Sequence, residues 1–378
     1  MAIDVPPEII VDIFSKLPVK SLCRFKCLSK AWLLLISNTK FAKMHLSRTN
    51  TQKFLNYHSS SRSLYSVDYE TSYQEDEVVA VKLGFPKKNK RRSRWVSIYG
   101  SCNGLILLRC QPKPYATYIY NPSINEYRQI PDEDDPGNLT ITHYNCFYGF
   151  GYAQPVDDYK VVKFCTREKN TVRVFSLRNN SWKRVELEYD ISKFYDTDNR
   201  GGIFLNGAIH WIFYDEGESK LVAFDLMEEN FKTLPLPEGI TSMCSSVGIL
   251  GGCLVFIERR RWGNYLWIMK EYNVIDSWEA ISMMDEDNYQ FECLQALCYL
   301  KINSEIMVGL ENEKLVFYNP RDETLKELAS RKISYNFPYC PDVYQESLVS
   351  PNYNANSTDE GINGYSLFIL HKIEELKI

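Results

Sequence analysis

Tight-turn dipeptides recur along most of this chain, and they constrain its fold more than any other feature. Asn103-Gly104, Asn206-Gly207 and Gly251-Gly252 each stand between short apolar runs. Such pairs are the strongest local signal for a β-hairpin, because both central residues of its turn need a positive φ. Weaker turn signals at Asp157-Asp158 and Asn303-Ser304 fill the gaps, so the five turns lie about 45 to 54 residues apart. This spacing is typical of the blades of a β-propeller.

A second periodic feature keeps the same spacing. One large residue at the end of an expected strand is followed seven positions later by another, with a polar turn between them. The pairs are Tyr120 with Tyr127, Phe175 with Trp182, Phe224 with Phe231, Tyr318 with Leu325 and, more loosely, Glu271 with Trp278. Residues 52–83 resemble a degenerate first blade, and a strand near 344–349 can close the ring. We therefore predict a mainly β fold, an antiparallel β-propeller-like repeat domain of about six blades that follows a small helical unit.

Composition limits the classes of partner. Lys and Arg number 44 against 48 Asp and Glu, so no overall field draws the protein to nucleic acid or anionic lipid, and we expect neither as a partner. The start has no secretory leader, and the longest apolar run, VGILGGCLVFI, is too short to span a bilayer. We expect a cytoplasmic and/or nuclear protein whose eleven cysteines are mostly reduced thiols.

The first 47 residues have a helical pattern instead. Asp4 can cap a helix that begins near Pro7, where the missing N–H of proline is tolerated. Pro18 stops this helix, because its ring clashes inside one. A second short helix carries Leu22, and Ser29 can cap a third. The sequence therefore predicts a three-helix unit.

This unit carries more apolar side chains than it can bury. The first helix has a wide apolar arc, made by Ile9, Ile10, Ile13, Phe14 and Leu17. The third helix contains AWLLLI, residues 31–36, which is apolar on every side. A unit of about 45 residues is near the lower size limit for independent stability, so such a surplus would form an exposed patch. We expect a protein partner to cover it, and the alternative is that the unit packs on the chain's own larger domain.

The helical unit also has features of a metal site and of a basic nucleic-acid contact. Cys23 and Cys27 would lie on one helix face, but a structural zinc site needs four ligands and no second pair of Cys or His follows nearby. Arg24, Lys26 and Lys30 alternate with apolar residues, as on the solvated side of an amphipathic helix. We therefore expect neither a metal nor a cofactor.

Residues 4 to 46 resemble a plant F-box almost continuously. The matching features are the opening Pro6, the apolar helix, the run LPVKSL from 17 to 22, then Cys27, Ser29-Lys30 and Trp32. The resemblance implies docking on the Skp-type adaptor of a cullin–RING ubiquitin ligase. It also implies that Trp32 braces the helices against one another. The residues that it implies as adaptor contacts are Val5, Pro6, Ile9, Ile10, Ile13, Leu17, Pro18 and Leu22. The family usually opens with Leu-Pro, so Val5 is a departure that modestly weakens this anchor.

Residues 99–350 resemble the F-box-associated domain of the same plant proteins, in family order. The matching segments include GSCNGLILL, YNPSINEY, GGIFLNGAIHWI, LGGCLVFI and YQESLVSP. The resemblance extends to pollen S-locus F-box proteins, and these motifs do not separate that branch from its relatives. We predict an F-box at 1–47, a linker and degenerate first blade at 48–98, a substrate domain at 99–350 and a tail at 351–378. The implied function is a substrate-recognition subunit of an SCF-type ligase.

No catalytic motif accompanies this organisation, so we expect a non-catalytic subunit. The chain has no glycine-rich phosphate loop and no GxSxG motif, and its acidic clusters are typical of solvated loops. A propeller scaffold outside any ligase, or a propeller enzyme, remains an alternative.

Loops supply candidate contacts for the target protein. One has Phe194 and Tyr195, and the other has Arg260, Arg261 and Trp262, residue types that are enriched at binding hot spots. Each aromatic side chain could instead pack on a neighbouring blade. The basic run PKKNKRRSR, residues 86–94, is a nuclear-import signal, a contact for an acidic or nucleic-acid partner, or an exposed loop between blades, and we favour the loop.

Overall fold

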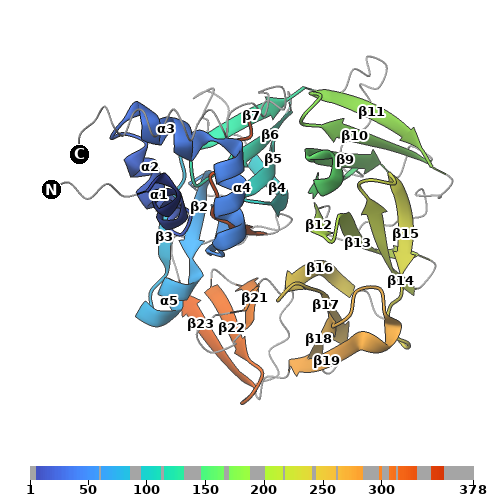
Figure 1. Cartoon of the computed structure of the whole chain (residues 1–378). Helices are drawn as coiled ribbons and strands as arrows, with labels where there is room; N and C mark the ends of the chain where they lie inside the picture. The colour runs from blue at the N-terminus through green and yellow to red at the C-terminus, as the bar shows by residue number, and fades with distance from the viewer. Residues whose placement is uncertain are drawn as a thin grey trace.

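The structure is a computed structural model, and it combines an N-terminal helical unit with a ring of β-sheets (Figure 1). It describes residues 6–58, 61–85, 95–111, 115–131, 146–165, 170–187, 201–215, 218–240, 244–260, 263–283, 298–299, 306–311, 314–329 and 342–352. The mainly β prediction with helices at the N-terminus is confirmed. Over the residues that the structure describes, no helix is both long and apolar enough to cross a bilayer.

Four short helices form the helical unit, one more than the sequence predicted. They are α1 (Pro7–Phe14), α2 (Val19–Phe25), α3 (Lys30–Ser37) and α4 (Thr39–Arg48). The Ser29 hydroxyl caps α3 as expected, accepting a hydrogen bond from the Trp32 N–H. Asn38 ends α3 and caps α4, because its side chain accepts from the N–H groups of Lys40 and Phe41. Asp4, the expected cap of α1, lies outside the described residues.

Antiparallel blades of four strands make up the ring. Four of the described sheets have four strands, and a fifth has eight because the inner strands of two blades pair, so the described strands form six blades. The first blade also contains α5 (Tyr69–Glu75). Its strands are β1 (Gln52–His58), β2 (Ser63–Asp68), β3 (Val79–Lys82) and β24 (Asp342–Gln345).

The other blades follow the order of the chain. The second has β4 (Trp95–Cys102), β5 (Leu105–Gln111), β6 (Ala116–Asn121) and β7 (Glu126–Ile130), and the third has β8 (Cys146–Ala153), β9 (Asp158–Cys165), β10 (Thr171–Ser176) and β11 (Ser181–Glu186). The fourth has β12 (Gly201–Leu205), β13 (Ala208–Asp215), β14 (Glu218–Asp225) and β15 (Asn230–Leu234). The fifth has β16 (Cys244–Leu250), β17 (Cys253–Arg260), β18 (Gly263–Met269) and β19 (Trp278–Met283), and the sixth has β20 (Cys298–Tyr299), β21 (Ile306–Glu311), β22 (Lys314–Asn319) and β23 (Thr324–Ala329).

The turn dipeptides adopt the backbone conformation that their sequences predicted. Asn103 and Gly104 have φ of 53° and 81°, and Gly251 and Gly252 have φ of 61° and 83°. Each pair joins the first two strands of its blade. At the corresponding position of the third blade, Asp157 has a φ of 51° and follows η2 (Gln154–Val156). Asn303-Ser304 lies outside the described residues.

Four of the five pairs that are seven residues apart lie directly opposite each other across their hairpins. These are Tyr120 with Tyr127, Phe175 with Trp182, Phe224 with Phe231, and Tyr318 with Leu325. The pairing of Glu271 with Trp278 was wrong, because Trp278 lies opposite Met269. The turn between these strands is longer and includes η4 (Ile275–Ser277), which the spacing did not indicate.

The ring is closed by a strand from the far end of the chain. β24 pairs with β1 in antiparallel orientation and is the inner strand of the first blade. This strand ends at Gln345, so it overlaps only the start of the expected strand at 344–349. Residues 347–349, which follow this strand, are bonded to the second blade. The Asn121 side-chain amide donates hydrogen bonds to the carbonyl oxygens of Ser347 and Val349, at 3.0 and 2.8 Å.

The third and fourth blades meet through a parallel pair of inner strands, β8 and β12. Gly201 lies opposite Tyr148 and Gly202 lies opposite Gly149. A Cβ on Gly202 would lie 2.4 Å from side-chain atoms of Ile209 and Trp211. Glycine at this position therefore permits the close approach of β12 to the side chains of β13.

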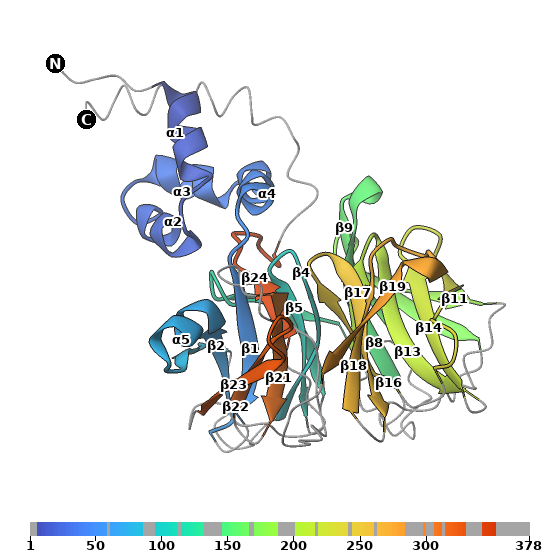
Figure 2. The same ribbon diagram turned by 90° about the horizontal axis from the view of Figure 1, so that it is seen from below.

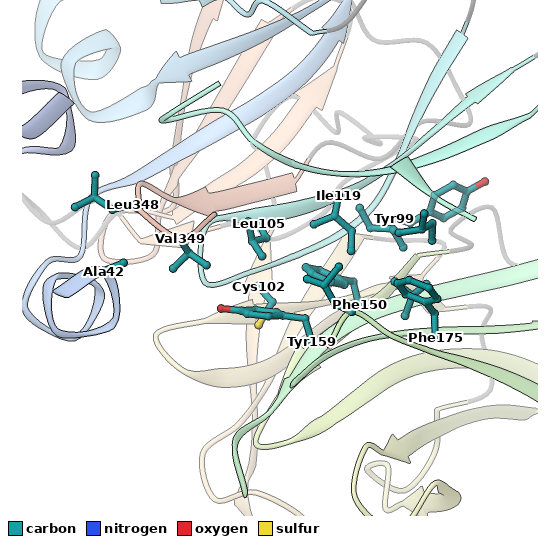
Figure 3. Close-up of a cluster of buried hydrophobic side chains, with 14 of the residues drawn as sticks. Ala42, Tyr99, Cys102, Leu105, Ile119, Phe150, Tyr159, Phe175, Leu348 and Val349 are labelled. Atoms are coloured by element: carbon teal, nitrogen blue, oxygen red, sulfur yellow. The ribbon is translucent and has the colours of Figure 1, made fainter. Parts of the chain in front are cut away.

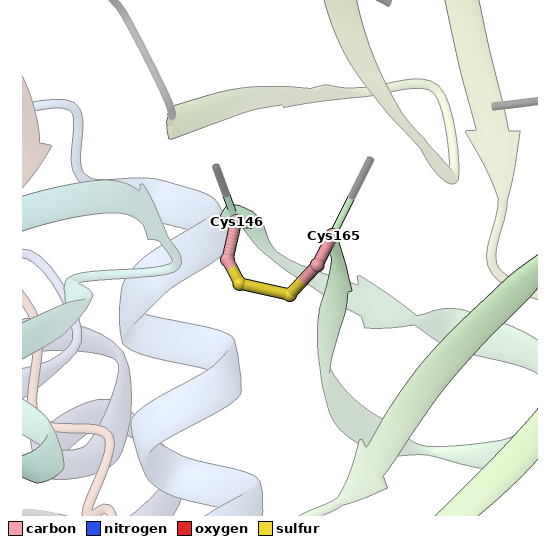
Figure 4. Close-up of a disulfide and its surroundings, with 2 residues drawn as sticks. All are labelled: Cys146 and Cys165. Atoms are coloured by element: carbon pink, nitrogen blue, oxygen red, sulfur yellow. A yellow bond between two sulfur atoms is a disulfide. The ribbon is translucent and has the colours of Figure 1, made fainter. Parts of the chain in front are cut away.

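A disulfide joins two neighbouring strands of the third blade (Figure 4). Cys146 on β8 and Cys165 on β9 face each other in the strand register, and both are buried. Other cysteines of the described part are free thiols: Cys23, Cys27, Cys102, Cys110 and Cys253. Sequence spacing of 19 residues did not reveal the bonded pair, because strand register brings it together.

Candidate protein-interaction surfaces

One face of α1 is left in solvent, and it carries Ile9 and Ile13, two of the residues assigned to the adaptor. Ile9 and Ile13 are each 50% exposed. Ile10 and Leu17 are half-buried, and Pro6 and Pro18 are exposed. Val5 lies outside the described residues. None of these described side chains is sealed beneath the chain's own sheets, so the surface is open to a partner.

Aromatic packing holds α1 on the rest of the helical unit. The Phe14 ring lies 5.2 Å from the Phe25 ring and 4.7 Å from the Trp32 ring, measured between centroids. Trp32 thus braces α3 against α1, which is the role that the resemblance implies for it. Since Phe14 faces inward, Ile9 and Ile13 are turned to the other side of this short helix.

Polar contacts from α4 also hold α1 in place. The Asp12 carboxylate accepts hydrogen bonds from Lys16 at 2.8 Å and from Arg48 at 2.6 Å, and these bonds lower the pKa of Asp12. His45 on α4, which is 1% exposed, has its Nε2 2.8 Å from the Leu17 carbonyl oxygen. The outward face of α1 is therefore presented on a fixed support.

Leu22 does not belong to the exposed face, which corrects its assignment as an adaptor contact. Its side chain is 0% exposed and lies in the same buried cluster as Val19, Leu35 and Ile36. The sequence pattern shows that a helix residue is apolar, but it does not show which neighbouring helix covers it.

Additional apolar side chains are exposed near the α2–α3 junction, and the sequence reasoning did not name them as site residues. Leu28 is 70% exposed, Leu33 is 45% exposed and Leu34 is 39% exposed. Ala31, Leu35 and Ile36 of the AWLLLI run are buried. The run's lack of a polar side was the signal that some of it stays uncovered.

The opposite side of the helical unit packs on the propeller (Figures 2 and 3). Phe41 and Ala42 of α4 share one buried cluster with Leu105, Leu348 and Val349. Lys43 forms an ion pair with Asp157 in the β8–β9 turn at 2.5 Å. The intramolecular alternative thus holds for α4 and fails for α1.

The C-terminal strand strengthens this junction. The Gln345 amide donates to the carbonyl oxygens of Leu46 and Thr49, at 3.1 and 2.5 Å. A cleft of about 270 Å³ lies beside it, between α4 and the propeller, and its lining includes Lys26, Glu126 and Asn352. The helical unit and the ring are therefore joined by apolar packing and by hydrogen bonds.

The residues assigned to the target protein fall mostly outside the described part. This is the case for Phe194, Tyr195, Arg261 and Trp262, and for the basic run at 86–94. Arg260 is the last residue of β17 and pairs with Gly263, as expected for a hairpin. Arg260 lies at the end of β17 opposite to the β16–β17 turn.

The described residues hold no group of three or more His, Cys, Asp or Glu side chains suited to a metal. Cys23 is half-buried and Cys27 is exposed, and the Cys27 thiol lies 3.8 Å from the Cys23 carbonyl oxygen. This is an ordinary contact within one helical turn.

Family comparisons match both parts of the chain. The family model of the F-box domain matches residues 3–44, and that of the F-box associated beta propeller domain matches residues 55–351. The F-box protein CPR1 of Arabidopsis thaliana is 30% identical over 386 residues, covering 91% of this chain and 87% of that protein. An F-box/kelch-repeat protein of Arabidopsis thaliana is 27% identical over 374 residues, covering 92% and 96%. Among solved structures, a DUF4784 family protein from Bacteroides caccae has a TM-score of 0.40 at 8% identity over 79% of this chain and 74% of that one.

Proposed function

Because this chain belongs to the plant F-box proteins with an F-box associated β-propeller domain, we propose that it is the substrate-recognition subunit of an SCF-type cullin–RING ubiquitin ligase. Its helical unit binds the Skp-type adaptor, and its propeller binds a target protein that is then ubiquitinated and degraded. The protein works in the cytoplasm, the nucleus or both.

The exposed face of α1 is the observation that carries this proposal. Ile9 and Ile13 stay half in solvent on a helix that packing and ion pairs hold still. Burying a side chain of this size completely contributes about 1.5 to 3 kcal/mol, and half-exposed residues contribute about half of that. Ile10, Leu17, Leu33 and Leu34 are also partly exposed. Together the six side chains contribute roughly 4.5 to 9 kcal/mol, which offsets a large part of the ordering cost of association, about 4 to 15 kcal/mol.

In this role the chain does no covalent chemistry. The ubiquitin-carrying enzyme of the ligase supplies the reaction, and this subunit raises the local concentration of the target lysine beside it. The fixed junction at α4 supports this, since a target held on the propeller keeps a defined position relative to the adaptor. Turnover of a small-molecule substrate by the isolated chain would favour the alternative of a propeller enzyme.

The test substitutes Ile13 in the full-length chain. Ile13→Asp places an unpaired charge in the apolar contact and should weaken adaptor binding roughly 100-fold or more, about 3 kcal/mol. Ile13 is a better probe than Leu17, because Leu17 packs partly against the core and its substitution would also disturb the helical unit. The Leu17 carbonyl oxygen also lies 2.8 Å from Nε2 of His45. Affinity is measured by surface plasmon resonance with purified adaptor.

Val81→Asp is the matched control, because Val81 is 60% exposed and lies on β3 of the propeller. It should bind the adaptor like the wild type. Stoichiometric co-purification of the Ile13→Asp variant with the adaptor would show that the surface is wrongly assigned. If the wild type itself does not bind, the non-ligase scaffold is the better reading.

A further inference from the structure

The turn between β18 and β19 is longer than the corresponding turns of four other blades; in the first blade the equivalent connection holds α5. Eight residues, 270–277, separate the last strand pair, Met269 and Trp278. The equivalent turn has four residues in the second, third, fourth and sixth blades: 122–125, 177–180, 226–229 and 320–323. The longer turn carries Tyr272, Val274 and Ile275, which are 39%, 41% and 44% exposed. Insertions in loops on a rigid scaffold are common sites of binding.

Hydrogen bonds hold this turn in one conformation. Burial lowers the pKa of His210 to about 4, so its ring is neutral; Nδ1 donates to the Ile203 carbonyl and Nε2 accepts from the Tyr272 hydroxyl at 2.8 Å. The Ser277 hydroxyl donates to the carbonyls of Glu271 and Val274 at 2.8 and 2.7 Å. A partner therefore meets an ordered surface, which lowers the entropy cost of binding.

A second turn from the neighbouring blade lies beside it. Tyr272 reaches His210 on β13, and burial together with the charge of Asp225 raises the pKa of Tyr272. Asp225 is the last residue of β14, and the β14–β15 turn that follows carries Met227, which is 43% exposed. We name Met227, Tyr272, Val274 and Ile275 the turn patch. Tyr is common at hot spots, and Met adapts its shape to different partners.

Acidic groups surround the turn patch. Glu228, Glu271 and Asp276 are exposed, and the structure gives none of them an ion-pair partner among the residues it describes. The basic groups of the same turns are already paired. Lys232 lies 3.3 Å from Asp225, and Lys270 lies 3.2 Å from Glu279. The free charge at the rim is thus negative, and it complements a basic partner.

We propose that the turn patch binds the target protein, through a segment in which large apolar side chains are flanked by lysine or arginine. This rests on the proposed function, since it names the surface that the ligase subunit offers to its target. The β18–β19 turn lies at the same end of the strands as the β8–β9 turn that contacts α4, so the bound segment lies on the face of the ring that carries the helical unit (Figure 2). The exposed face of α1 stays free for the adaptor.

The test uses a phage-displayed library of random 16-residue peptides, selected on the full-length chain bound to purified adaptor. Enriched peptides should combine two or more large apolar residues with lysine or arginine. Val274→Asp with Ile275→Asp should weaken their binding at least tenfold in fluorescence polarisation. Glu271→Lys with Asp276→Lys should also weaken it at least tenfold, and this loss should shrink at high salt.

Val156→Asp is the matched control, since Val156 is 40% exposed in η2 at the same end of the propeller and should leave peptide binding unchanged. Adaptor affinity is measured on every variant, so failure of the turn patch is distinguished from failure of the ligase assignment. The proposal is overturned if no peptide is enriched, if enriched peptides lack basic residues, or if the double aspartate variant binds them normally. A wild-type dimer that the aspartates dissociate, seen by light scattering, would assign the turn patch to a second copy instead.

Discussion

The helical unit and the propeller differ in how completely they bury their large apolar side chains. In the propeller, Phe164 and Phe224 are 0% exposed, because each blade is covered by a neighbouring blade on both faces. In the helical unit, Ile13 and Leu33 stay about half exposed, because four short helices provide too few layers to cover every apolar face. The ring thus buries its large apolar side chains within itself, whereas α1 leaves part of its apolar surface exposed.

Helix α4 marks the boundary between these two modes. Its buried Phe41 and Ala42 join the core of the ring, while α1 on the other side remains uncovered. The apolar surface of this small unit is thus divided in two. One part, on α4, is covered by the propeller, and the other, on α1, stays exposed. The following experiments test this division.

The largest expected effect is in the propeller core. Phe164→Ala removes a ring that contacts Phe147, Trp211 and Phe231 at centroid distances of 5.2, 5.2 and 5.3 Å. The free energy of unfolding should fall by about 3 to 5 kcal/mol, measured by urea denaturation with tryptophan fluorescence. Leu33→Ala, on the exposed side of α3, should change it by less than about 0.5 kcal/mol. Equal losses in the two variants would contradict the division.

A smaller effect is expected from a buried polar group, His210. The folded-state pKa of about 4 lies below the ordinary value of 6.5, so the unfolded chain takes up a proton first as the pH falls. Stability should be unaffected above pH 6.5 and should decrease between pH 6.5 and 4, by up to about 3 kcal/mol. His210→Gln should remove this part of the pH dependence of the urea midpoint. An unchanged pH profile in that variant would show that His210 is not the group responsible.

The smallest effect is expected at the boundary itself. The ion pair of Lys43 with Asp157 has side chains that are 39% and 37% exposed, so water and salt screen it. Lys43→Ala should reduce stability by less than about 1 kcal/mol. Hydrogen exchange should become faster in α4 but not in α1, which other contacts hold. Equal changes in both helices would mean that the helical unit moves on the propeller as one body.

Features that depend on neighbouring residues were predictable. The turn dipeptides Asn103-Gly104 and Gly251-Gly252 have positive φ as expected, and Ser29 capped α3 as expected. Features that depend on chain segments far apart were not. The sequence shows that Leu22 is an apolar helix residue. Its burial depends on residues of α3 and α4 that share its cluster. The eight-residue turn makes Met269, and not Glu271, the residue opposite Trp278. The length of this turn depends on where β18 and β19 stop pairing.

By itself the sequence determined the repeating hairpins, the start of α1, the cap of α3 and the apolar surplus of the N-terminal unit. Each of these follows from backbone preferences and side-chain type within a few residues. The sequence indicated that a strand near 344–349 can close the ring, and tertiary structure decided that this strand pairs with β1. Tertiary structure also decided that α4 covers part of the propeller and that the β18–β19 turn is bonded to His210 of the neighbouring blade. These depend on contacts between residues tens to hundreds of positions apart, and only the folded chain brings such residues together.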